Sequence, residues 1–330
     1  MASYIRRRKF LATLGGAAAW PLAARAQQTG RVRRVGVLMT LAADDPEAQA
    51  RIGTFLQGMQ EFGWTIGRNL RIDYRWGADL NSVARYAAEL VALAPDVILA
   101  NANPSVVALQ RATPSVPIVF VAVTDPVAAM FVENLARPGG NATGFSTGEY
   151  GTSAKWLELL KDIVPSVTQV GVLHDAHNPS SIPQFAAIQS IAPSLGVELK
   201  TLSLRDVGEI ERIVATFARG SNLGLIVTRI GTAISHRDLI IALATRYRLP
   251  AVYPLRFFVA GGGLASYGPD IVDQYRRAAE YIRRILNGES PTNLPVQAPM
   301  KYETVINVKA AKGAWPRNPA VAARARRRGH

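Results

Sequence analysis

Short apolar runs alternate with amphipathic stretches along most of the chain. Residues 35–39, 96–100 and 117–123 are almost wholly apolar, as is typical of strands buried on both faces of a sheet. Between such runs, apolar positions recur at helical spacing. One of these stretches starts at Asp45-Pro46, which reads as an N-cap followed by a proline in the first turn. The alternation predicts a parallel sheet covered by helices on both faces.

The same pattern appears twice. In residues 70–76 apolar and charged side chains alternate, which predicts a half-exposed strand near a sheet edge. A break at 138–141 then precedes a second series of similar length, so we expect two similar lobes. The second series predicts strands over 169–174, 197–202, 223–228 and 251–254, and the last part predicts a strand over 264–267, a helix over 270–287 and a strand near 305–308.

The formal net charge of +14 is concentrated at the two ends. Residues 1–26 carry five basic side chains, residues 312–330 carry six, and neither segment has an acid. Removing these eleven charges leaves +3 for residues 27–311. A nucleic-acid-binding protein would carry a basic face on its folded body, so we expect no nucleic-acid partner.

The first 26 residues have the form of an export signal. A basic start is followed by a short apolar stretch and by Ala24-Arg25-Ala26, which resembles a cleavage site. Arg7-Arg8-Lys9-Phe10-Leu11 matches the twin-arginine pattern, which favours the Tat route over Sec. The alternative, a membrane anchor, is disfavoured because a span needs about 20 apolar residues. We expect a periplasmic protein.

The absence of cysteine excludes several kinds of chemistry. A chain without cysteine has no disulfide, no thiol nucleophile, no Cys-type zinc site and no lipid-anchoring cysteine. The pair His174 and His177 has no third metal ligand nearby in the sequence, so we expect no metal. No phosphate-loop or dinucleotide motif is present either, and we expect no cofactor.

Small polar side chains follow several of the predicted strands. Ligands of parallel α/β sheets bind at the carboxyl ends of the strands, where helix N-termini also favour anions. Each residue taken alone is more often an ordinary N-cap, and it is their recurrence at several strand ends that favours binding. The candidates at these ends are Met39, Asn101, Thr124, Asp125, His174, Asp175 and Thr228.

Residues 144–148 match the G-x-S-x-G nucleophile elbow and make Ser146 a second kind of candidate. That motif needs a buried strand before the serine and a helix starting at it. The sequence before Gly144 reads instead as a loop, and no acid-then-histidine arrangement stands out. An exported serine hydrolase using Ser146 is therefore the alternative function, and we expect no catalytic residue.

Three segments resemble the tryptophan/tyrosine-type ABC transporter substrate-binding protein family. They are residues 115–145, with Thr124-Asp125-Pro126 and Pro138-Gly139-Gly140-Asn141, residues 259–268, and Leu294-Pro295-Val296-Gln297. The resemblance implies a type I periplasmic-binding-protein fold, in which two doubly wound parallel-sheet lobes are joined by three crossovers. The implied lobes are 32–145 with 255–290, and 146–254 with 296–312.

The resemblance also implies a function. The expected protein is a monomer that captures a small solute between its lobes, an amino acid (aromatic ones included) or a related carboxylate. It would pass this ligand to an inner-membrane permease and its ATPase. The implied ligand-binding positions include Ser146 and two tyrosines able to stack on an aromatic ligand, Tyr253 and Tyr267. A sensory role fits the sequence equally well.

The C-terminal end departs from the family. After Lys312 the chain runs into Trp315-Pro316 and a series of arginines, where family members have an acidic amphipathic helix. We expect residues 313–330 to be a disordered basic tail that is dispensable for folding.

Overall fold

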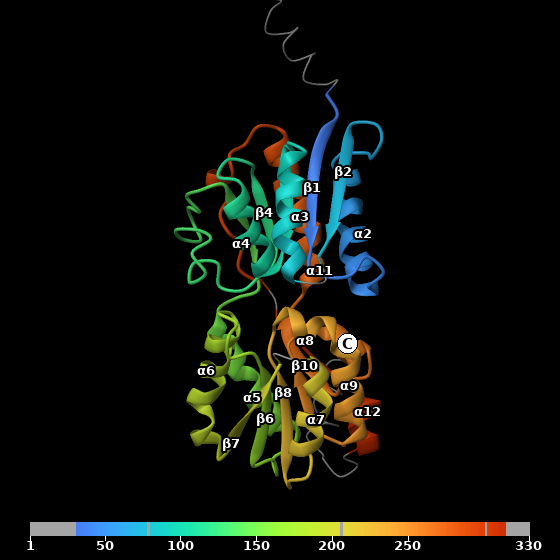
Figure 1. The fold of residues 1–330 in the computed structure, drawn as a ribbon, viewed down its shortest axis with the longest axis vertical. Helices are drawn as coiled ribbons and strands as arrows, with labels where there is room; N and C mark the ends of the chain where they lie inside the picture. Colours follow the sequence, from blue (N-terminus) through green and yellow to red (C-terminus); the bar gives the residue numbers. More distant parts are fainter. Residues whose placement is uncertain (1–30, 78–79, 205–206, 301, 315–330) are drawn as a thin grey trace, which may run out of the picture.

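The chain forms two lobes, each with its own sheet (Figure 1). The computed structural model describes residues 31–77, 80–204, 207–300 and 302–314. The sheet of the first lobe has the order β2-β1-β3-β4-β5, and all its strands are parallel. Its strands are β1 (Arg33–Met39), β2 (Leu70–Trp76), β3 (Val97–Asn101), β4 (Ile118–Val123) and β5 (Ala142–Ser146).

The second lobe carries a sheet of order β11-β10-β9-β8-β6-β7. All its pairs are parallel except β10 with β11. The strands are β6 (Gln169–His174), β7 (Glu198–Ser203), β8 (Leu223–Val227), β9 (Ala251–Tyr253), β10 (Ala265–Pro269) and β11 (Tyr302–Ile306). Two parallel-dominated sheets confirm the predicted α/β class.

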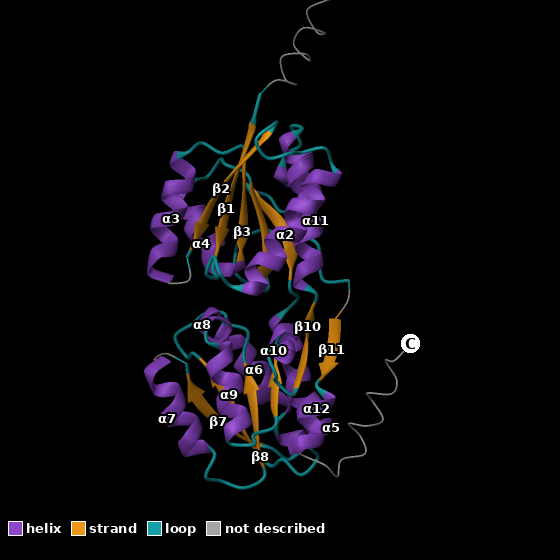
Figure 2. Ribbon diagram, turned by 90° about the vertical axis from the view of Figure 1, so that its right-hand side faces the viewer, coloured by secondary structure: helices purple, strands orange, loops and turns teal. Residues whose placement is uncertain are grey.

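Helices cover both faces of each sheet (Figure 2). In the first lobe α2 (Pro46–Glu61) packs on α11 (Ile271–Leu286), and α3 (Leu80–Ala92) packs on α4 (Ala102–Ala112). In the second lobe the helices are α5 (Ala154–Ile163), α6 (Ser181–Ile191), α7 (Val207–Phe217), α8 (Gly231–Ser235), α9 (Arg237–Arg246), α10 (Arg256–Ala260) and α12 (Val308–Ala314). Short 3₁₀ turns lie at Tyr150–Ser153, Pro193–Leu195 and Pro291–Asn293.

The predicted strands and helices lie close to where the apolar pattern placed them. Alternate residues of the central strands enter the two layers, with Val35 and Val37 facing α2 and Leu38 facing α3. The half-exposed strand β2 lies at a sheet edge, as its alternation predicted. The Asp45 side chain caps α2 by accepting a hydrogen bond from the Glu47 N–H.

Strand β5 is an element that the sequence did not predict. Its Thr143-Gly144 reads like a turn, but Gly144 lies where β4 and β5 approach closely. A Cβ at Gly144 would be 2.0 Å from the Phe120 carbonyl oxygen, and the glycine has φ +150°. Glycine inside a strand often marks such a close backbone approach. The loop expected over 136–141 is present, but the interpretation that no strand precedes Ser146 was wrong, because Ala142–Ser146 is a buried strand.

Three crossovers connect the lobes, as expected. The chain leaves the first lobe after β5, returns between β10 and α11, and leaves again after Gln297, which runs beside β5. The expected strand 264–267 does not return to the first lobe. It pairs with β9 and β11 in the second lobe, and α10 packs there too. The return therefore occurs at Asp270, the N-cap of α11, rather than near residue 255.

Both predicted terminal segments lie largely outside the described residues. Nothing described bears on the signal at 1–26, and of the predicted tail only 313–314 are described, as the end of α12. Among the residues that are described, none of the helices has the length and apolar character needed to cross a bilayer.

Candidate functional site

The carboxyl ends of the parallel strands in both sheets point toward the junction between the lobes (Figure 2). The two lobes touch there. Buried apolar side chains form one continuous cluster across the junction, and polar side chains also pair across it. The predicted strand-end residues fall into separate groups along this junction, and each group has its own chemistry.

The first group surrounds Arg229 on the side of the crossovers. Thr124, after β4, shares a hydrogen bond with Thr147 at 2.9 Å between the two Oγ1 atoms. Arg229, after β8 in the second lobe, donates from Nε to Thr124 Oγ1 at 3.3 Å. Thr124 therefore contacts the opposite lobe.

Among the residues that the structure describes, no acid lies beside the buried Arg229 guanidinium. The residue is 8% exposed, and its Nη2 has no hydrogen-bond partner within the described part of the chain. Burial lowers the pKa of Arg229 to about 10, opposed by the nearby Tyr302 and Tyr150, so the group stays charged at neutral pH. A buried cation normally has an anionic partner. Its spare N–H group can therefore hold a carboxylate.

Gln184 of α6 fixes the backbone of Arg229. The fully buried amide accepts from the Arg229 N–H at 2.8 Å and donates to the Arg229 carbonyl at 3.2 Å. The guanidinium thus projects from a rigid support, as a preorganised ligand contact requires.

Ser146 and Asp125 lie next to this group, but their side chains bond within their own turns. Ser146 Oγ accepts from the Gly148 N–H at 2.9 Å, and Asp125 Oδ1 accepts from the Ala128 N–H at 3.1 Å. Gly148 has φ +97°, and a Cβ there would be 1.8 Å from the Tyr302 hydroxyl. The two crossovers touch at this point, which requires glycine. The geometry describes a turn at a crossover rather than an activated nucleophile.

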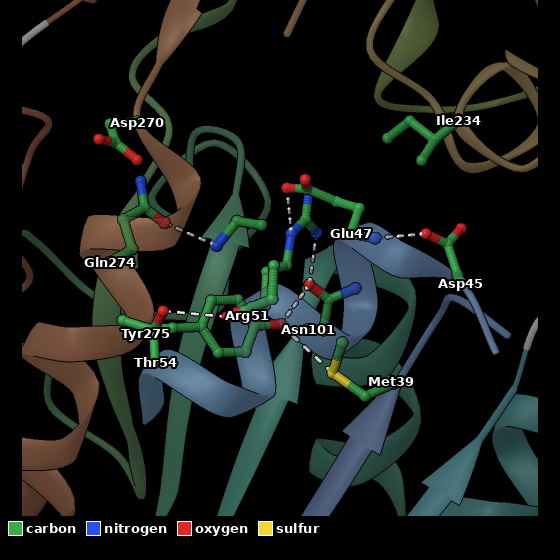
Figure 3. A network of polar contacts seen from close by, with 12 residues as sticks. Met39, Asp45, Glu47, Arg51, Thr54, Asn101, Ile234, Asp270, Gln274 and Tyr275 are labelled. Carbon is green, nitrogen blue, oxygen red and sulfur yellow. Dashed lines mark hydrogen bonds and ion pairs between the residues drawn. The ribbon is translucent and has the colours of Figure 1, made fainter. Parts of the chain in front are cut away.

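A second group lies at the ends of β1 and β3 (Figure 3). Tyr275 of α11 donates its hydroxyl proton toward Asn101 Oδ1 at 2.8 Å and lies 3.3 Å from Met39 Sδ. Arg51 of α2 lies over Asn101 and pairs with Glu47, with 2.9 Å between Nε and Oε1. The predicted pair Met39 and Asn101 is thus brought together, beneath an arginine that the sequence analysis did not select.

The three candidates at the ends of β6 and β8, which are His174, Asp175 and Thr228, make their contacts mainly within the second lobe. Thr228 is fully buried and donates from Oγ1 to the Leu173 carbonyl at 2.8 Å. Asp175 accepts from the His177 N–H at 2.9 Å in the loop before α6. His174 stacks on Phe185 with 4.4 Å between ring centroids, and its buried Nδ1 has no hydrogen-bond partner among the described residues.

His174 leads to a pH prediction. Burial lowers the pKa of His174, partly opposed by Asp175, whereas an unfolded histidine titrates near 6.5. As the pH falls below 6.5, the unfolded chain takes up a proton that the folded protein resists, so stability falls. We expect the wild type to lose more melting temperature between pH 7.5 and 5.5 than His174→Phe, which keeps the ring stack. An equal loss in both proteins, measured by calorimetry, would contradict this prediction.

The two predicted tyrosines are both stacked on protein rings. Tyr253 is buried against Phe258 with 5.0 Å between centroids, and burial raises its pKa. Tyr267 stacks on Tyr302 at 5.4 Å. One face of each ring is therefore already occupied, and neither ring is a free stacking platform on both faces.

An ion pair also joins the lobes on the side away from the crossovers. Asp45 at the start of α2 accepts two hydrogen bonds from Arg237 at the start of α9, at 2.6 and 3.1 Å. The two side chains are 10% and 15% exposed. The Phe257 ring lies within 6 Å of two guanidinium carbons, those of Arg51 and Arg237.

Sequence reasoning missed Arg229, Arg51, Asp45 and Arg237 as residues of the junction between the lobes. Arg229 carried a usable signal, because it directly follows a buried strand and the selected Thr228. Asp45 and Arg237 lie at helix starts, where charges are common, and Arg51 lies in the second turn of α2. Within the described ranges no cluster of three or more His, Asp or Glu is arranged to hold a metal ion.

Comparison with known proteins assigns the chain to a protein family. A family model described as "ABC transporter substrate binding protein" matches residues 34–314. The chain is 27% identical over 259 residues to the "Tyrosine-binding protein" of Clostridioides difficile (strain R20291), which covers 78% of this chain and 74% of the relative.

Two solved structures differ in how well they superpose. An ABC domain from Streptococcus pneumonia in complex with L-Trp shares 26% identity, covers 86% of this chain and 94% of its own, and superposes with a TM-score of 0.77. A ligand-free, open substrate-binding protein from Clostridium difficile is also 26% identical, with 86% and 95% coverage, but its TM-score is 0.64. The chain therefore superposes better on the L-Trp complex than on the open protein.

Proposed function

Since the chain belongs to the ABC transporter substrate-binding protein family, we propose that it captures an amino acid with an aromatic side chain, or a closely related carboxylate, between its two lobes. The observation that carries this proposal is the buried Arg229 guanidinium, whose Nη2 has no partner in the described protein. Its charge, without an acid beside it, suits the carboxylate of such a ligand. The aromatic part of the proposal rests on the relative named for tyrosine and on the neighbour that holds L-Trp.

Substrate-binding proteins of this family work outside the cytoplasm and serve an ABC transporter. We propose in addition that residues 1–26 are a twin-arginine signal and that the mature protein is an unanchored periplasmic monomer. The Arg7-Arg8 pair and the absence of cysteine support this. The Ser146 turn offers no activated nucleophile, which supports binding without catalysis over the hydrolase alternative.

A ligand screen tests the proposed function. Residues 27–330 would be melted with L-tyrosine, L-tryptophan, L-phenylalanine and the matching amines that lack the carboxylate, such as tyramine. A ligand at 100 times its Kd stabilises by about 2.7 kcal/mol, which raises the melting temperature by roughly 5 °C. We expect this shift with at least one amino acid and with none of the amines. Equal shifts with tyrosine and tyramine, or no shift with any solute, would contradict the proposal.

A further inference from the structure

A second buried guanidinium, that of Arg51, faces the junction between the lobes (Figure 3). The residue is 2% exposed. Its Nε is 2.9 Å from Glu47 Oε1, and its Nη1 is 3.5 Å from Asn101 Oδ1. Its Nη2 has no hydrogen-bond partner in the described protein. One buried N–H group therefore remains available, and leaving such a donor unpaired is unfavourable.

The surroundings of Arg51 place this donor at the junction between the lobes. Its guanidinium carbon lies 5.8 Å from the centroid of the Phe257 ring, which belongs to α10 of the opposite lobe. On the other side, Asn101 Oδ1 is already occupied by the Tyr275 hydroxyl at 2.8 Å. The Arg51 side chain is thus held by Glu47 and Asn101 of the first lobe and faces the Phe257 ring of the second lobe.

The two guanidinium groups both lie at the carboxyl ends of strands of the first sheet. Arg51 lies over the ends of β1 and β3, through Met39 and Asn101, whereas Arg229 reaches Thr124 and Thr147 at the ends of β4 and β5. Two strand positions separate these pairs in the sheet order. At about 4.8 Å per strand, the strand ends contacted by Arg51 and those contacted by Arg229 are roughly 10 Å apart. One small molecule can span that distance.

The charges around Arg229 and Arg51 differ, and this difference determines which end of the ligand each arginine binds. Arg229 has no acid beside it in the described ranges and therefore suits a carboxylate. Arg51 is already neutralised by Glu47, so a second carboxylate would be repelled by the Glu47 side chain. A neutral oxygen, such as a phenol, hydroxyl or carbonyl oxygen, accepts a hydrogen bond from Nη2 without that repulsion.

We propose that Arg51 is a specificity-determining residue that hydrogen-bonds a neutral oxygen at the end of the ligand far from its carboxylate. This inference rests on the proposed function, because the carboxylate at Arg229 sets the orientation. It selects a ligand with a phenol or similar group over one with a purely apolar side chain. It also disfavours a dicarboxylate.

Calorimetric titration with two ligands that differ by one oxygen tests the role of Arg51. For residues 27–330 we expect L-tyrosine to bind at least about tenfold more tightly than L-phenylalanine. The double variant Glu47→Gln/Arg51→Met removes the donor and its paired acid together, so no buried carboxylate is left alone. In this variant we expect the ratio of the two Kd values to fall to about 1. Arg246→Gln, an exposed change on α9, should keep the wild-type ratio.

The ratio of two affinities separates this inference from the proposed function. Arg229→Met should weaken both amino acids while leaving their ratio unchanged, because it acts on the shared carboxylate. If wild type binds both amino acids but does not distinguish them, or if the double variant still prefers tyrosine, the role of Arg51 is refuted and the proposed function stands. If neither amino acid binds, the proposed function fails and this inference fails with it.

Discussion

Replacing Arg229 with methionine is expected to weaken binding of the aromatic amino acid by about a hundredfold or more, which corresponds to about 2.7 kcal/mol. No acid lies beside the buried Arg229 guanidinium in the part of the chain that the structure describes. The carboxylate of the proposed ligand would therefore lose its charged partner. Methionine fills similar space without charge. Titration calorimetry of the wild type and the variant measures the loss directly.

The unliganded Arg229→Met protein should be as stable as the wild type or more stable. Burying an unpaired cation is unfavourable, and the lost Thr124 hydrogen bond contributes only about 1 kcal/mol. A residue needed for folding would behave in the opposite way, with a large fall in melting temperature. Arg246→Gln removes a charge from the surface of the same lobe and serves as the control. Unchanged affinity in Arg229→Met would exclude the carboxylate assignment.

The fold was largely predictable from the sequence because its signals are local. Buried strands and amphipathic helices each show their own period within a few residues. The strand order at the second return was not predictable in this way. Whether 264–267 adds to the first or the second sheet depends on pairing with β9 and β11, which the apolar pattern of the strand itself does not encode. Strand β5 was hidden by Gly144, whose role depends on Phe120.

The candidate site was predictable only as a set of positions. Strand ends could be located, so Asn101 and Thr124 were selected, and both lie beside an arginine that faces the cleft. Which of two consecutive residues points across the cleft could not be read from the sequence. Thr228 turns back to the Leu173 carbonyl, whereas Arg229 reaches the other lobe. The pair Asp45 and Arg237 is separated by 192 positions and leaves no local pattern.

That interlobe pair gives the second large prediction. Asp45→Asn should weaken ligand binding by roughly thirtyfold, or about 2 kcal/mol, because the pair holds the lobes together in the arrangement described here. Asparagine is a good N-cap and can still accept from the Glu47 N–H, so α2 keeps its cap while the cross-lobe charge is lost. The unliganded variant should also have a larger radius of gyration in X-ray scattering, since a more open form is populated.

A double-mutant cycle separates the interaction between Asp45 and Arg237 from the individual contribution of each residue to ligand affinity. If Asp45 acts through Arg237, then Arg237→Gln should reduce ligand affinity about as much as Asp45→Asn does. The double variant should then lose no more affinity than either single variant. Burial acts to raise the pKa of Asp45, but hydrogen bonds from Arg237 and the Glu47 N–H bring it below the ordinary 3.8. The pair is therefore ionised throughout pH 5–8, and the effect of Asp45→Asn should be constant across that range. Additive losses in the cycle, or an unchanged radius of gyration with unchanged affinity, would show that closure does not depend on this pair.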